Sequence, residues 1–465
     1  MMKSLSAIQL GNKPELIVDE IDIADPVGNQ VMIKLISSGI CHSQLHQMHD
    51  KNLPKPFLLG HEATGVVLKT GPDCNYVQEG DHVIATWVRR NPIKGRYLPD
   101  LKGVSYQEKK LNCRITFTWS EIIMSEDEYV VKIPKKYATP ESCIVGCSIL
   151  TGAGAVKNTA RVKPGETVAI FGVGGIGLAA VKMASLLKAS KIIAVDIDNE
   201  KLEFSKQFGA THTINSLENN PINEIFDLTN GGVDYAFDAI GKKITINQIF
   251  EAIKQGGSGA DNTGGTSILI GIPESPEITL DANQILLTQK TFKGSLGATY
   301  PEKDFVYFLE MYKKGEFPIN KMISKSFNLS EINEACKKII NLQKAKNGYV
   351  KPIIWRGRKI MAISAQKNKI HVAIATWEWG SYFDPKLKLN GIKLNISSWR
   401  RPAPNTIPWD TKAAGLYMIC TLSKHEAEAE GFTDSLMLDH EGNIAEATGA
   451  NVFFKNKDGE LITPI

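Results

Sequence analysis

The chain has 465 residues, enough for about three domains of ordinary size. Its formal net charge is only +4, and 43% of its residues are hydrophobic. The balanced charge argues against a nucleic-acid-binding surface, and the composition is typical of a globular protein with a substantial core. No apolar run approaches the roughly 20 residues of a membrane helix, and the N-terminal residues lack the apolar core of a secretory signal. The sequence therefore predicts a cytoplasmic protein with neither membrane nor nucleic-acid partners.

The seven cysteines are scattered along the whole chain. An odd number of cysteines over this length argues against a disulfide framework and favours a reducing compartment. In such a compartment a cysteine serves as a metal ligand or as a small core residue.

In chain order, residues 1–150 are predicted to form mostly short strands, separated by turns at Gly60, Gly71 and Gly80. From about Thr151 the pattern changes to strand, glycine turn, helix and strand, repeated with further apolar strands. This alternation predicts a doubly wound parallel sheet. After about residue 295 come two helical stretches and a short strand.

The pattern changes again beyond about residue 355. Strands are predicted within residues 362–379 and 387–399, and a helix over 411–431 that ends at a glycine. Residues 435–465 predict a β-meander with Glu-Gly and Asp-Gly turns. The Gly/Ser-rich stretch 258–265 predicts a flexible loop.

A glycine turn joins the first strand and helix of the predicted parallel sheet. Gly172, Gly174, Gly175 and Gly177 form a GxGxxG turn, and Asp196 follows 19 residues after Gly177, close to the expected spacing of about 20. Such glycines permit the tight turn, the approach of a pyrophosphate and close helix packing, and the helix N-terminus offers free N–H groups to phosphates. A carboxylate at Asp196 would bond both ribose hydroxyls and repel a 2′-phosphate, which favours NAD over NADP. The alternative is a tight turn that binds nothing.

Cys41, His61 and Cys147 form a set of two thiols and one imidazole suited to zinc. Three protein ligands leave a fourth position open, as catalytic zinc requires. The ligands are 20 and 86 residues apart, so they can meet only through folding. Each of them alone could equally be a packed core residue.

With the motifs GICHSQLH, GHEATG and GCSILTG upstream of GVGGIG, the chain up to about residue 355 resembles the zinc-dependent medium-chain alcohol dehydrogenase family. The resemblance implies an α/β protein with a GroES-like catalytic domain (residues 1–150 and 295–355) and a Rossmann NAD-binding domain (residues 151–294). The active site is expected in the cleft between them. The expected cofactors are zinc and NAD, the substrate is a small alcohol or aldehyde, and the assembly is a homodimer or homotetramer.

The same resemblance assigns catalytic roles. Cys41, His61 and Cys147 would bind the catalytic zinc, and Glu62 would be the carboxylate behind it. Zinc lowers the pKa of a bound hydroxyl.

The proton would then leave through a relay. Ser43 would hold the hydroxyl proton, and His46 would pass it to solvent. Trp87 falls where the family places an aromatic wall beside the zinc, which would favour short alcohols, although it could equally pack the β-rich domain.

Four further residues correspond to cofactor contacts in the family. His42 would touch the pyrophosphate, Thr151 the nicotinamide and Lys201 the adenosine ribose, and Lys351 matches a basic position that reaches the pyrophosphate.

The sequence departs from the family in three places. Four cysteines hold a second, structural zinc in the family, but residues 88–118 offer only Cys113, so one catalytic zinc per chain is expected and no structural zinc. Gln44 stands where the family usually has the aspartate that accepts a hydrogen bond from the zinc-ligand histidine. A glutamine oxygen can accept that bond but carries no charge.

The third departure is the stretch of residues 258–265, which has the character of an insertion.

From about residue 350 the motifs WRG, SSWRRPAPNTIPWDTKAAGLY and GNIAEATGANVFF resemble the branched-chain amino acid aminotransferases of fold type IV. By position, Lys412 would form a Schiff base with pyridoxal phosphate, Tyr417 would lie beside it and Glu446 would bind its pyridine nitrogen. The match covers a truncated α+β aminotransferase class IV fragment over residues 356–465. Because the rest of that family's fold is missing, pyridoxal phosphate binding and transamination are not expected.

Two alternatives to a zinc- and NAD-dependent alcohol dehydrogenase remain open. One is transaminase activity from the C-terminal part, and the other is a nucleotide-binding protein without turnover. A zinc-free quinone-reductase-like activity is disfavoured, because such relatives generally lack the Cys41, His61 and Cys147 set.

Overall fold

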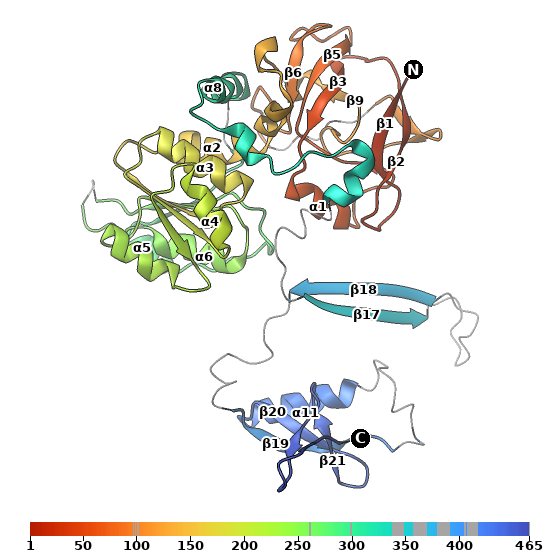
Figure 1. The fold of residues 1–465 in the computed structure, drawn as a ribbon, viewed down its shortest axis with the longest axis vertical. Coiled ribbons are helices and arrows are strands. Elements are labelled where there is room, and N and C mark those ends of the chain that lie inside the picture. The colour runs from red at the N-terminus through yellow and green to blue at the C-terminus, as the bar shows by residue number, and fades with distance from the viewer. Residues whose placement is uncertain are drawn as a thin grey trace. The chain divides into compact units, whose positions relative to one another are not determined.

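The computed structural model describes residues 1–465 apart from 96, 98, 100–101, 260–261, 298–299, 337–347, 357–369, 379–390, 404–405, 407–416 and 465; for residues 348–356, 370–378 and 417 it describes the backbone alone. The chain divides into two compact units, Met1–Gln343 and Lys344–Ile465 (Figure 1).

The N-terminal part of the first unit consists of two five-stranded sheets whose strand pairs are antiparallel. The first has the order β4-β1-β2-β7-β8 and is formed by β1 (Met2–Gln9), β2 (Ile17–Ile23), β4 (Phe57–Leu58), β7 (Val104–Tyr106) and β8 (Lys109–Lys110). The second has the order β10-β6-β5-β3-β9 and is formed by β3 (Gln30–Ser38), β5 (Ala63–Thr70), β6 (His82–Ala85), β9 (Ile122–Glu126) and β10 (Val130–Lys132).

One hydrophobic core joins these two sheets. Ile8 and Ile21 from the first sheet and Val31, Val67 and Ile123 from the second belong to the same buried cluster. Apolar side chains on one face of each sheet therefore fill the space between them. The short elements of this part are α1 (His42–His49), η1 (Asp127–Tyr129), η2 (Lys135–Tyr137) and η3 (Pro140–Gly146). The predicted β-rich character of this part is confirmed.

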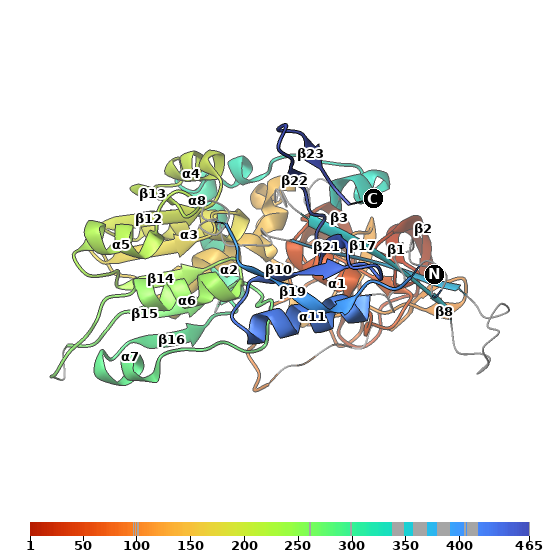
Figure 2. The same ribbon diagram turned by 90° about the horizontal axis from the view of Figure 1, so that it is seen from below.

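A six-stranded parallel sheet follows, with the order β13-β12-β11-β14-β15-β16. Its strands are β11 (Thr167–Phe171), β12 (Lys191–Asp196), β13 (His212–Asn215), β14 (Tyr235–Asp238), β15 (Thr266–Leu269) and β16 (Thr291–Gly294). Figure 2 shows them side by side, from β13 to β16. The associated helices are α2 (Ser148–Gly154), η4 (Ala155–Ala160), α3 (Gly175–Leu186), α4 (Asn199–Lys206), α5 (Pro221–Thr229), α6 (Lys243–Ala252) and α7 (Ala282–Leu287).

Helices pack on both faces of this sheet, and alternate side chains of each strand point toward one face or the other. In β11, Val168 and Ile170 pack into the cluster that contains residues of α3 and α4. Their neighbours Ala169 and Phe171 pack into the cluster that contains residues of α5 and α6. Successive side chains of a strand point to opposite faces, so a strand buried on both faces is apolar throughout. The predicted doubly wound sheet is confirmed.

After β16 the chain continues through α8 (Pro301–Lys313), η5 (Ile319–Met322) and η6 (Leu329–Glu331). It then contacts the β-rich part again. Ile332 and Cys336 share a core cluster with Ala7 of β1 and Leu45 of α1. Asn333 exchanges hydrogen bonds with the backbone of Leu16, at 3.1 and 2.7 Å. Most of the second helical stretch predicted here lies outside the described residues.

The described residues of the second unit form three small sheets and one helix. β17 (Gly348–Arg356) pairs antiparallel with β18 (Ile370–Glu378). β19 (Leu394–Arg400), β20 (Asp434–Leu438) and β21 (Ile444–Ala447) form a sheet against which α11 (Tyr417–Ala429) packs, and β22 (Phe454–Lys455) pairs with β23 (Leu461–Ile462). Gly442 and Gly459 have positive φ at the two predicted hairpin turns, which are confirmed.

Among the described helices, none has the length and apolar content that crossing a bilayer requires.

Candidate metal centre and dinucleotide site

Three different elements bring the predicted zinc ligands together. Cys41 is the N-cap residue of α1, His61 lies between β4 and β5, and Cys147 lies between η3 and α2. One ligand atom from each lies within 4.8 Å of the others, and the two sulfur atoms are 3.9 Å apart. Folding has therefore assembled residues that are 20 and 86 positions apart in the sequence.

The surroundings of these atoms suit a cation. The His61 Nε2 atom is buried and has no hydrogen-bond partner among the described residues. A hydrogen bond from Cys147, together with the nearby His61, holds the pKa of Cys41 well below its usual range in spite of burial. Two thiols and one imidazole nitrogen without a partner among the described residues, in a group whose members are buried or half-buried, fit zinc.

Glu62 is buried behind this group. Burial and the nearby charge of Cys41 raise the pKa of Glu62 to about 8. Its Oε2 atom accepts a hydrogen bond from the backbone N–H of Ser148 at 3.3 Å. A Cβ atom at Gly39 would lie 2.3 Å from Glu62 Oε1, so a glycine at position 39 leaves the space for this carboxylate.

The two predicted relay residues lie on α1. Ser43 Oγ is 3.5 Å from His61 Nδ1, and the exposed His46 ring lies 4.8 Å from the ring of His42, centre to centre. No described hydrogen bond joins Ser43 to His46 directly. A relay between them therefore needs a bridging hydroxyl group or water.

Trp87 lies beside the metal ligands. Its indole interacts with the Cys147 thiol, although its buried Nε1 makes no hydrogen bond of ordinary geometry with any described residue. The predicted position beside the zinc site is therefore compatible with the structure.

The glycine turn between β11 and α3 has the expected backbone. Gly172 has φ of +87°, and a Cβ atom at Gly177 would lie 1.8 Å from the carbonyl oxygen of Gly172. A Cβ atom at Gly174 would meet no atom within 4 Å, so the space above this residue is open. At Gly175 it would lie 2.8 Å from Ser148 Oγ. Because Ser148 follows Cys147, this short distance shows that the glycine turn lies close to the metal centre.

Asp196 ends β12 and is only 8% exposed. Its carboxylate accepts hydrogen bonds from the backbone of Val173 at 2.9 Å and of Ile197 at 2.8 Å. The carboxylate thus fixes the glycine turn, a role that sequence reasoning missed. Nearby, Thr151 on α2 has a buried hydroxyl with no partner among the described residues, which leaves it available to a ligand.

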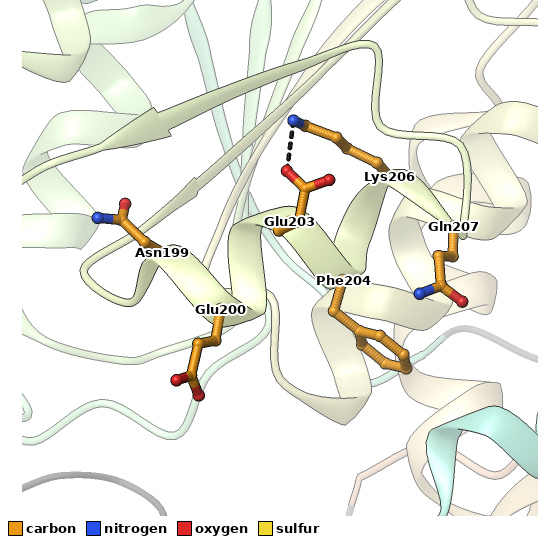
Figure 3. Close-up of a pocket in the computed structure, with 6 residues that line it drawn as sticks. All are labelled: Asn199, Glu200, Glu203, Phe204, Lys206 and Gln207. Atoms are coloured by element: carbon orange, nitrogen blue, oxygen red, sulfur yellow. Dashed lines mark hydrogen bonds and ion pairs between the residues drawn. The ribbon is translucent and has the colours of Figure 1, made fainter.

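Lys201 is partly buried on α4. A shallow pocket on this helix contains an ion pair of 2.5 Å between Glu203 and Lys206 (Figure 3). No predicted site residue lines this pocket; the lining residues are Asn199, Glu200, Glu203, Phe204, Lys206 and Gln207.

Three comparisons with known proteins bear on this site. Residues 28–135 match the alcohol dehydrogenase GroES-like domain, and residues 175–314 match the zinc-binding dehydrogenase family. The chain is 32% identical to alcohol dehydrogenase class-3 of Zea mays over 352 residues, which cover 70% of this chain and 90% of that protein. It is 31% identical to S-(hydroxymethyl)glutathione dehydrogenase of Escherichia coli, over 72% of this chain and 96% of that protein.

The chain belongs to the zinc-dependent alcohol dehydrogenase family.

Solved structures agree with this assignment. Benzyl alcohol dehydrogenase of Acinetobacter calcoaceticus superimposes with a TM-score of 0.66 at 28% identity, covering 73% of this chain and 97% of that one. An alcohol dehydrogenase zinc-binding domain protein of Burkholderia ambifaria superimposes with a TM-score of 0.68 at 26% identity. The match covers 74% of this chain and 97% of that one.

In this alcohol dehydrogenase, the loop after β6 is held by an arginine that sequence reasoning also missed. Arg90 stacks on Tyr76, with its Cζ atom 3.4 Å from the ring centre, and its NH1 group contacts Glu302 of α8 at 3.0 Å.

Burial raises the pKa of Cys113 to about 12, so this thiol stays neutral. The absence of a structural zinc stays a prediction.

Residues 320–465 match the amino-transferase class IV family. In this part of the alcohol dehydrogenase chain, Glu446 lies on β21 and forms an ion pair with the Nε atom of Arg401 at 2.9 Å. Tyr417 begins α11, whereas Lys412 lies outside the described residues. Lys351 lies on β17, in the second unit, and its contact with a pyrophosphate stays a prediction.

Proposed function

We propose that the chain is an NAD-linked alcohol dehydrogenase with one catalytic zinc, held by Cys41, His61 and Cys147. The observation that carries this proposal is the approach of the three ligands to within 4.8 Å of one another. The position of Ser148 supports it, since this residue follows Cys147 and lies close to the glycine turn. Hydride would pass between a small alcohol and the nicotinamide.

The chain's own residues would orient the reactants and move the proton. A zinc ion in this site would lower the pKa of an alcohol hydroxyl and stabilise the charge that develops on its oxygen. Ser43 would receive the proton inside the pocket, and the exposed His46 would release it to solvent. The Thr151 hydroxyl, which has no partner in the described part of the chain, would contact the nicotinamide.

The cofactor preference would follow from charge. Asp196 keeps a buried carboxylate at the end of β12, next to the glycine turn. A ribose diol can donate to this group, whereas a 2′-phosphate would meet its negative charge. NAD is therefore the cofactor we propose. His42 and Lys201 would contact it, with the roles given above.

A small primary or secondary alcohol is the proposed substrate class. The bulky Trp87 indole beside Cys147 would narrow the site and favour short alcohols. The expectation that the C-terminal unit contributes no transamination stays a prediction. An absorption band of a pyridoxal phosphate Schiff base in the purified protein would contradict this last point.

The test is NADH formation by the purified full-length protein across short and branched alcohols, with bound zinc quantified. Cys147→Ala should lose zinc and turnover together, because a missing ligand leaves an incomplete site. Cys143→Ala is the matched control, since Cys143 is equally buried but lies outside the ligand group. Turnover by Cys147→Ala at wild-type rates would refute the proposal, and NADH binding with full zinc but no turnover would favour the nucleotide-binding alternative.

A further inference from the structure

Gln44 lies between two of the zinc-ligand residues. It is the third residue of α1, and only 1% of it is exposed. Its Oε1 atom accepts a hydrogen bond from the backbone N–H of Cys41 at 3.0 Å. Its Nε2 atom is hydrogen-bonded to Nδ1 of His61. One side-chain amide therefore contacts both ligands.

The contact with Cys41 fixes which way the amide points. A backbone N–H can only donate, so the amide atom that faces it must be the oxygen. The amide NH2 group then faces His61 and also can only donate. His61 Nδ1 must therefore accept, and a neutral imidazole that accepts at Nδ1 carries its proton at Nε2.

This proton occupies the nitrogen that zinc needs. Nδ1 of His61 faces Gln44 and, at the longer distance of 3.5 Å, the Ser43 hydroxyl, so Nε2, which is buried and has no partner among the described residues, is the atom left for the metal. A metal binds only a nitrogen without a proton. Moving the proton to Nδ1 would leave two donors facing each other, the ring N–H and the NH2 group of Gln44.

We propose that Gln44 holds His61 in the tautomer that cannot bind zinc. Zinc binding then requires the Gln44 amide to rotate, which breaks its hydrogen bond with the Cys41 N–H. Gln44 is thus a positioning residue that acts through His61 and weakens zinc binding. This inference rests on the zinc site of the proposed function.

A glutamate of the same shape removes the conflict, because both carboxylate oxygens accept hydrogen bonds. One can accept from the Cys41 N–H while the other accepts from a ring proton at His61 Nδ1. In Gln44→Glu we expect the dissociation constant for zinc to fall by roughly 10- to 100-fold, the usual size of effects from groups that orient a metal ligand. The constant is measured on the full-length protein by competition with a chelator.

Gln47→Glu is the matched control. It adds the same charge to the same helix, but its side chain makes no described hydrogen bond with His61. Equal zinc affinity in Gln44→Glu and Gln47→Glu would overturn the proposal, because the gain would then come from charge alone. Weaker binding by Gln44→Glu would overturn it as well.

A second measurement does not depend on any variant at position 44. Nitrogen-15 NMR of histidine-labelled, metal-free wild type should show the His61 proton on Nε2, with the signal assigned by its loss in His61→Gln. Loading with zinc should move the proton to Nδ1. A proton on Nδ1 before loading would overturn this inference alone, whereas a wild type that binds no zinc would overturn the proposed zinc site too.

Discussion

Gly174 and Gly177 lie three residues apart in one turn and have opposite surroundings. The backbone of Gly172 occupies the space that a side chain at position 177 would need. A side chain at position 174 would instead point into open space, and Gly174 has an ordinary φ of −71°. One glycine is therefore required by the fold, and the other is free for a ligand to approach.

This difference gives a prediction. Gly177→Ala should destabilise the protein by at least about 1 to 3 kcal/mol, because the methyl group would overlap a backbone oxygen. Gly174→Ala should leave the unfolding free energy within about 0.5 kcal/mol, yet weaken NADH binding about tenfold or more, or about 1.4 kcal/mol. Urea unfolding and NADH fluorescence titration measure the two effects. Unchanged NADH affinity in Gly174→Ala would argue against a pyrophosphate at this turn.

Asp196 gives the prediction on cofactor choice. In Asp196→Asn the side-chain oxygen can still accept from the Val173 N–H, but the hydrogen bond from the Ile197 N–H and the negative charge are lost. The ratio of kcat/KM for NAD to that for NADP should fall by about tenfold or more, about 1.4 kcal/mol. Steady-state kinetics with both cofactors checks this. A ratio equal to that of the wild type would exclude Asp196 from cofactor selection.

At the scale of elements, Asp234 forms hydrogen bonds that connect the starts of the neighbouring parallel strands β11 and β14. It precedes β14, and its carboxylate accepts from the backbone N–H and the hydroxyl of Thr167 at the start of β11, both at 2.8 Å. Lys254 approaches the other carboxylate oxygen at 2.5 Å. Burial by itself would raise the pKa of Asp234, but the hydrogen bonds from Lys254 and Thr167 outweigh it and lower the pKa.

Because folding lowers the pKa of Asp234, the contribution of this carboxylate to the free energy of unfolding decreases at low pH. Asp234→Asn should lose about 1.5 kcal/mol of unfolding free energy at neutral pH, because the charged hydrogen bonds are lost. The stabilisation is fully present above the unfolded-state pKa of about 3.9 and disappears as the pH falls through the lower folded-state pKa. Urea unfolding of wild type and variant between neutral pH and pH 3 should show the difference shrink. A difference that grows toward low pH would contradict this assignment.

At the scale of the whole molecule, α7 and β16 present an apolar surface. α7 buries none of its residues, and Leu286 and Leu287 are 74% and 69% exposed. β16, which follows α7, is an edge strand of the parallel sheet. Exposed apolar side chains beside an unpaired strand edge favour association with a second copy of the chain.

We therefore expect the homodimer or homotetramer to use this surface. The double variant Leu286→Glu and Leu287→Glu should dissociate it, because two charges would be buried in the interface. Leu217→Glu is the control, since Leu217 is 75% exposed elsewhere in the first unit. Size-exclusion chromatography with light scattering measures the mass. A monomeric wild type, or a double variant with unchanged mass, would contradict the prediction.

The amino-acid sequence was sufficient to predict the two main architectures and to select the three residues that folding brings together as a candidate zinc site. The double-sided apolar strands and the glycine turn predicted the parallel sheet, because burial on both faces and a tight turn each need particular residue types at fixed spacing. The motifs around Cys41, His61 and Cys147 identified the family, although spacing alone could not show that the three meet. The glycine stops and hairpin turns of the C-terminal part were also predictable from local residues.

Only the tertiary structure decided how these residues are partnered. The orientation of the Gln44 amide depends on a backbone N–H and an imidazole brought together by folding. Asp196 bonds to a turn that lies 23 residues away, and Arg90 bonds to Glu302 at a separation of 212 residues. Secondary structure and turns depend on residues that are neighbours in the sequence. The partner of a hydrogen bond, the direction of the bond and the burial of its atoms depend instead on which distant segments the fold places against each other.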